Sequence, residues 1–79
     1  MRVKTKKLIV TFATTAAVMA LEQACASREE LGRVIPTPQA ISAGCGLAWC
    51  APIAQEAALL RLMEEHAIAY DAMTLVDMY

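Results

Sequence analysis

The chain has 79 residues, of which 58% are hydrophobic and 5% aromatic, and its formal net charge is −1. A chain of this length forms one small domain, so residues 1–79 are expected to fold as a single unit. The near-neutral charge and the scarcity of aromatic side chains argue against nucleic acid or a membrane surface as the partner. The basic run at residues 1–6 is expected to be a frayed, solvated terminus.

The N-terminal third permits two interpretations. The basic run, the apolar residues 8–21 and the small residues Ala24-Cys25-Ala26 together resemble a secretory signal, although the apolar stretch is too short to span a membrane. The same stretch divides into a β-branched and aromatic strand, Leu8–Phe12, and a helix that Thr14 or Thr15 can cap. We favour the strand and helix, because apolar residues recur at helical spacing after the threonines. This interpretation places the protein in the cytoplasm, where thiols stay reduced.

The whole chain is expected to alternate between strands and helices. In chain order the expected elements are a strand at 7–12, a helix at 15–30, a strand at 33–35, a loop at 37–46, a strand at 47–50, a helix at 52–66 and a strand at 68–76. Gly32 is expected to end the first helix and Pro52 to begin the second. The order β-α-β-β-α-β predicts an α+β domain of the ferredoxin-like, split βαβ type, with two helices on one face of an antiparallel sheet. The other sheet face is expected to contact a partner or to form a homodimer.

The three cysteines do not follow a metal or redox motif. Cys45 and Cys50 are not a C-x-x-C pair, and a strand between them would separate them by about 16 Å, too far for a disulfide. A zinc site needs four ligands, and the single histidine, His66, is expected at a helix end. No metal and no cofactor are therefore expected. Cys25 and Cys50 are interpreted as small packing residues.

Cys45 stands apart because glycines flank it in the run Gly44-Cys45-Gly46. Glycines permit unusual backbone angles and let backbone N–H groups converge on an anion. A thiolate held in this way has a lowered pKa and a raised reactivity. A tight turn that contains a cysteine by chance explains the same residues, and local features alone do not decide between the two.

At a larger scale the chain resembles the family of selenium/sulfur (Se/S) carrier-like domains over nearly its whole length. The matching residues are Leu8–Phe12 with Thr14-Thr15-Ala16-Ala17, Val34-Ile35-Pro36-Thr37-Pro38, Ile41-Ser42-Ala43-Gly44-Cys45-Gly46-Leu47-Ala48, and the closing helix and strand. The resemblance implies a cytoplasmic α/β domain in which Cys45 is the carrier thiol and Gly44 and Gly46 support it. The sequence departs from the family at Trp49-Cys50, where the family often has larger or basic residues.

Two functions remain open from the sequence. In the first, which the resemblance implies, Cys45 holds a persulfide or a selenium adduct and passes it between proteins of a sulfur relay. The donor would be a cysteine desulfurase or a sulfurtransferase-like protein, and the domain would be a carrier more than a true enzyme. In the second, the domain is a non-catalytic interaction or dimerisation module, and Cys45 is incidental.

Overall fold

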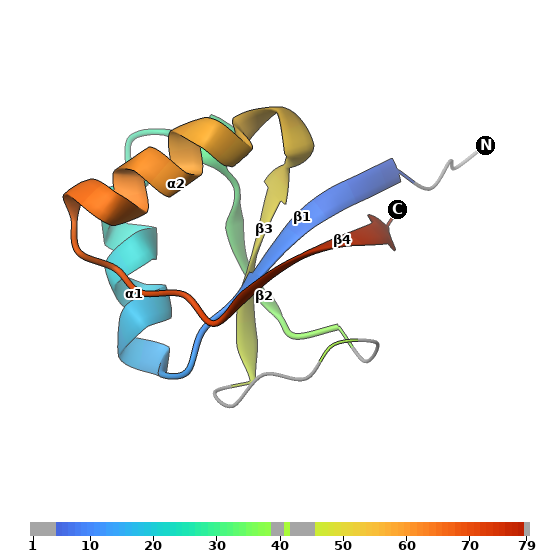
Figure 1. The fold of residues 1–79 in the computed structure, drawn as a ribbon, viewed down its shortest axis with the longest axis horizontal. Coiled ribbons are helices and arrows are strands. Elements are labelled where there is room, and N and C mark those ends of the chain that lie inside the picture. The colour runs from blue at the N-terminus through green and yellow to red at the C-terminus, as the bar shows by residue number, and fades with distance from the viewer. Residues whose placement is uncertain (1–4, 39–40, 42–45, 79) are drawn as a thin grey trace.

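The computed structural model describes residues 5–38, 41 and 46–78, and the structural statements below concern these residues. The described residues form a four-stranded sheet, two α-helices and two short 3-10 helices (Figure 1). In chain order the elements are β1 (Thr5–Thr11), α1 (Thr15–Ala24), η1 (Glu29–Leu31), β2 (Arg33–Pro36), β3 (Leu47–Pro52), η2 (Ile53–Gln55), α2 (Glu56–Glu65) and β4 (Ala72–Met78). Each α-helix has ten residues, and within the described ranges no helix has the length and hydropathy to cross a membrane.

The sheet has the strand order β2-β3-β1-β4, and each neighbouring pair is antiparallel. Figure 1 shows both α-helices on one side of this sheet. Each helix connects two strands that have a third strand between them, which is the split βαβ arrangement. The structure therefore confirms the expected small α+β domain of ferredoxin-like type.

The segment that resembles a secretory signal forms the centre of the fold. β1 lies between β3 and β4, and Leu8 and Val10 are at most 2% exposed. Thr14 caps α1, because its hydroxyl oxygen accepts a hydrogen bond from the Ala17 N–H over 3.2 Å. Val18 of α1 is also fully buried. The strand-and-helix interpretation is confirmed, since these residues form one of the two inner strands and one of the two α-helices found in the described part of the chain.

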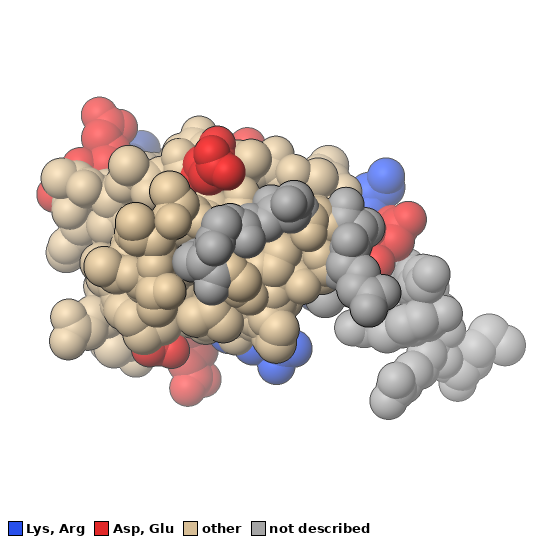
Figure 2. Space-filling view, turned by 90° about the horizontal axis from the view of Figure 1, so that it is seen from below, with Lys and Arg blue, Asp and Glu red and all other residues tan. Residues whose placement is uncertain are grey.

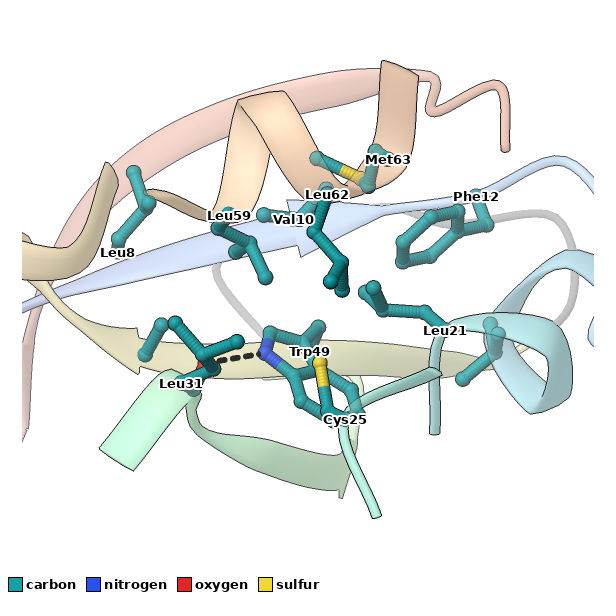
Figure 3. Packing of buried hydrophobic residues seen from close by; sticks show 12 residues of the cluster. Leu8, Val10, Phe12, Leu21, Cys25, Leu31, Trp49, Leu59, Leu62 and Met63 are labelled. Carbon is teal, nitrogen blue, oxygen red and sulfur yellow. Dashed lines mark hydrogen bonds between the residues drawn. The ribbon is translucent and has the colours of Figure 1, made fainter. Parts of the chain in front are cut away.

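The core lies between the sheet and the two α-helices (Figure 3). Trp49 of β3 is its largest fully buried side chain, and its indole N–H donates to the Leu31 carbonyl over 2.8 Å. The other residues labelled in Figure 3 are Leu8, Val10, Phe12, Leu21, Cys25, Leu59, Leu62 and Met63. Burial of side chains of this size contributes about 1.5–3 kcal/mol each, so the apolar layer dominates the stability of the domain.

The first helix is shorter than expected. α1 ends at Ala24, turns follow, and η1 occupies Glu29–Leu31. Gly32, with a φ of 114°, follows η1 as its C-cap and does not end α1 as expected. The break has a packing cause: the chain must turn back so that Leu31 enters the core and its carbonyl accepts from the tryptophan indole.

The second helix and the last strand also begin later than expected. Pro52 has an extended backbone, with φ −63° and ψ 142°, and ends β3, while α2 begins only at Glu56 after η2. The fixed φ of proline suits an extended residue as well as a first helical residue, so the sequence did not discriminate between them. At the far end of α2, Ala67 takes a left-handed conformation with φ 54°, and the Ile68 N–H donates to the Met63 carbonyl over 2.8 Å. This helix ending and the turn after it delay the start of β4 to Ala72.

Candidate functional site

The predicted carrier loop joins β2 to β3, and most of its predicted site residues lie outside the described part of the chain. Cys45, the predicted carrier thiol, and Gly44 are both outside it, so their roles stay predictions. Gly46 is described: it is exposed and has a φ of 77°. A Cβ atom at Gly46 would meet nothing within 4 Å, so the backbone conformation alone favours glycine at this position.

The sheet fixes the two ends of this loop. β2 and β3 pair as far as Pro36 and Leu47, and the Thr37 N–H then donates to the Gly46 carbonyl over 3.0 Å. The residue that directly follows Cys45 in the sequence is therefore anchored to the end of a hydrogen-bonded hairpin. A site at this end of the hairpin is supported by a rigid element of the fold.

Cys25 is not available for chemistry at the surface. It follows α1 as its C-cap, is 4% exposed and belongs to the core cluster. Burial raises the pKa of the Cys25 thiol above its usual value; the nearby Arg28 opposes this shift and Glu30 adds to it. The expectation of a small buried hydrophobe is confirmed, and a thiol in this state is a poor nucleophile.

Cys50 differs from the packing residue that was expected. It is a free thiol of intermediate burial and is not part of the core cluster formed by the described residues. In the sheet it lies directly opposite Ile9 of β1 and Arg33 of β2. Side chains alternate along a strand, so Cys50 points to the face without helices while Trp49 points into the core.

Cys50 lines a pocket of about 490 Å³ at the end of the sheet where β1 and β2 begin and β3 ends. The pocket is also lined by Lys7, Arg33 and Glu29, which come from three different elements. Sequence analysis missed this group because its members are far apart in the chain. The one available signal was the register of the β2–β3 hairpin, which sets Arg33 opposite Cys50.

The described residues contain no group of three or more His, Cys, Asp or Glu side chains placed to hold a metal ion. His66 is exposed and is the C-cap residue of α2, which confirms the helix-end position expected for it. The described residues include two free thiols, Cys25, which is buried, and Cys50, which is partly exposed.

Comparison with known proteins finds one family, described as "Putative Se/S carrier protein-like", which matches residues 7–74. The match begins in β1, ends in β4 and spans the loop that contains Cys45. No curated protein and no solved structure matches the chain.

Proposed function

Because the chain belongs to the Se/S carrier protein-like family, we propose that it carries a sulfur or selenium atom as an adduct on the thiol of Cys45. The observation that supports this proposal is the family match over residues 7–74, which includes both strands that flank the Cys45 loop. The burial of Cys25 supports it further, because a core thiol cannot exchange sulfur with a partner protein.

The transfer is a thiol exchange. The Cys45 thiolate attacks the outer sulfur of a persulfide on the donor protein, a new S–S bond forms at Cys45, and the donor's cysteine leaves as a thiolate. The hydrogen on the outer sulfur stays with it, so the step needs no external oxidant or reductant. An acceptor thiolate removes the outer sulfur by the same reaction. A cysteine desulfurase or a sulfurtransferase-like protein suits the donor role, and the reducing cytoplasm is the compartment in which such thiols stay available.

The test loads the reduced protein from a cysteine desulfurase supplied with cysteine, and intact mass is then measured. We expect a mass gain of about 32 Da for one added sulfur. The gain should disappear in Cys45→Ser and persist in Cys25→Ser, which is the matched control because Cys25 is buried. Equal loading of Cys45→Ser and the unchanged protein would refute the carrier role of Cys45.

A dimerisation module is the second candidate, and the edge strand β4 is the observation that favours it. β4 is the last strand of the described sheet, and Leu75 in it is 50% exposed. Such a strand can pair with a second copy through its outer edge. The helix-free sheet face is a weaker candidate than expected, because Ile9 and Ala48 at its centre are 0% exposed. Seen from below the view of Figure 1, the described surface is mostly uncharged, and its charged side chains lie mainly around the edge (Figure 2).

Light scattering during size-exclusion chromatography tests this second candidate. A dimer that dissociates in Leu75→Lys would support pairing through β4, because a lysine on an edge strand disfavours strand addition. A monomer at all concentrations would refute it and would leave the carrier proposal untouched.

A further inference from the structure

The pocket at Cys50 brings a thiol and two basic side chains to one face of the sheet. Arg33 is the direct cross-strand partner of Cys50, and Lys7 lies on β1 two residues before Ile9, the other partner. Residues that pair directly, or that are two apart along a strand, point to the same face, so Lys7, Cys50 and Arg33 share the helix-free side. Cβ atoms of direct partners, such as Arg33 and Cys50, are about 5 Å apart, and those of diagonal partners, such as Lys7 and Cys50, are about 7 Å apart. Both cations therefore lie close to the Cys50 thiol.

The two cations of this pocket are not neutralised by other described residues. Lys7 is half-buried and Arg33 is exposed, and neither takes part in an ion pair or a side-chain hydrogen bond within the described ranges. The ion pair found among the described side chains joins Arg28 to Glu30 and lies outside this pocket. Among the described residues, Glu29 is the only carboxylate that lines the pocket. The described lining therefore offers an anionic ligand two unpaired positive charges and one negative charge.

Gly32 lets the chain approach β3 closely at the edge of this pocket. It lines the pocket, and an added Cβ atom would collide with the carbonyl oxygen of Cys50 and with the indole nitrogen of Trp49. The absence of a side chain lets η1, with Glu29, lie against the end of β3. A volume of about 490 Å³ is within the usual range for pockets that bind small molecules.

We propose that Cys50 is a second reactive thiol, which accepts sulfur from a small anionic persulfide bound in this pocket. The ligand class is a thiol-derived persulfide with carboxylate groups and an ammonium group, for which glutathione persulfide is the probe. Its carboxylates would face Lys7 and Arg33, and its ammonium group would face Glu29. This inference goes beyond the carrier function proposed for Cys45, because it concerns a different thiol and a small-molecule donor.

The reaction at Cys50 balances without another reagent. The Cys50 thiol first loses its proton to solvent, and the thiolate attacks the outer sulfur of R–S–SH. The bond between the two sulfurs of the donor breaks as the new bond to the Cys50 sulfur forms. The products are Cys50–S–SH and the thiolate RS⁻, which takes up a proton from solvent.

The test uses Cys45→Ser, so that sulfur added to the partly exposed Cys50 is measured without the loop thiol. Reduced protein is mixed with glutathione persulfide, and the rate of sulfur addition at Cys50 is followed by peptide mass spectrometry. A unit charge about 7 Å away changes the local concentration of a singly charged anion about threefold in a water-like dielectric. We therefore expect Arg33→Gln and Lys7→Gln each to slow the addition about threefold or more, and their combination about tenfold.

Lys6→Gln is the matched control, because Lys6 is the neighbour of Lys7 on β1 but points to the other face. It should leave the rate unchanged. Iodoacetamide, a neutral reagent, reports how accessible and reactive the Cys50 thiol is in each variant, so the persulfide rate is divided by the iodoacetamide rate of the same variant. This ratio should fall in Arg33→Gln and Lys7→Gln and stay unchanged in Lys6→Gln. Loss of reactivity toward both reagents would indicate a disturbed fold and is checked by circular dichroism of each variant.

Three results would overturn the inference. The first is no sulfur on Cys50 after mixing with glutathione persulfide, and the second is a rate in the Lys7 and Arg33 variants equal to that of the protein that retains both cations. The third is sulfur on Cys50 after mixing with the desulfurase and cysteine, without glutathione persulfide. The last result would make a protein persulfide the donor. The first two results do not bear on the loading of Cys45. For the third, peptide mass spectrometry of the protein that retains Cys45 shows which of the two thiols carries the sulfur. The two proposals can therefore fail separately.

Discussion

Gly32 and Gly46 both have a positive φ, but only Gly32 is crowded by neighbouring atoms. Comparing the two positions therefore distinguishes the energetic cost of the backbone conformation from the cost of crowding. Gly32 has φ 114° and ψ −161°, a region that is open almost only to glycine. A Cβ atom there would also lie 2.7 Å from the Trp49 indole nitrogen. This nitrogen is the atom that donates the hydrogen bond to the Leu31 carbonyl. Gly46 has φ 77° with open space around it. Substituting each by alanine applies the same chemical change to a crowded and to an open position.

The structure sets the size of the two effects. At Gly32 the strained backbone costs about 1–3 kcal/mol. Displacing the buried indole from its acceptor costs about 1–3 kcal/mol more, so Gly32→Ala should lower the free energy of unfolding by about 2–6 kcal/mol. Gly46→Ala should lower it by only about 1–2 kcal/mol, the cost of a left-handed residue with a side chain. A domain of 79 residues has a total stability of about 4–12 kcal/mol, so the first change approaches the limit of folding.

The assay is urea unfolding followed by far-UV circular dichroism and by the fluorescence of Trp49, the only tryptophan. For a domain of this size a loss of 3 kcal/mol corresponds to a fall in Tm of about 12–24 °C. The reasoning is refuted if the two variants lose equal stability, because the close approach of Gly32 to β3 would then carry no cost.

Three further changes test other parts of the fold. Ala67→Gly should raise the free energy of unfolding by about 1 kcal/mol in thermal unfolding, because Ala67 holds a left-handed φ of 54° at the end of α2. Thr14→Ala should lower it by about 1 kcal/mol, since the cap on the Ala17 N–H is lost, and Thr14→Ser should retain most of the stability. Burial raises the pKa of Cys25, so the unfolded chain releases this proton at a lower pH than the folded one. Stability should therefore fall as pH rises above about 9, and a parallel titration of Cys25→Ala, which lacks this fall, checks the assignment.

The sequence predicted the topology because hydrophobic period and turn residues carry that information locally. Leu8–Phe12 indicated a buried strand, and the structure places it at the centre of the sheet. The ends of the helices were wrong where tertiary contacts decide them. α1 stops at Ala24 because Leu31 must return to the core, and no local signal at residues 25–30 shows this.

The site was less predictable than the fold. Cys45 was singled out by its two glycine neighbours, a local feature, and its role stays a prediction because it lies outside the described residues. Cys50 was expected to be a packing residue, and the pocket beside it was not foreseen because its neighbours there, Lys7 and Arg33, are far from it in sequence. Only the register of three strands brings them together. A strand position in a small sheet always has two possible faces, and a shift of one residue exchanges them.

The geometry of β3 also bears on how two thiols in one chain would share sulfur. β3 is extended from Leu47 to Pro52, and Cys50 lies three residues from its start, about 10 Å along the strand. The pocket is at the far end of β3 from Gly46, the anchored end of the carrier loop. A rigid strand therefore holds Cys50 away from Gly46. If Cys50 accepts sulfur, the pocket needs a donor that reaches this end of the sheet, and a small persulfide meets that need.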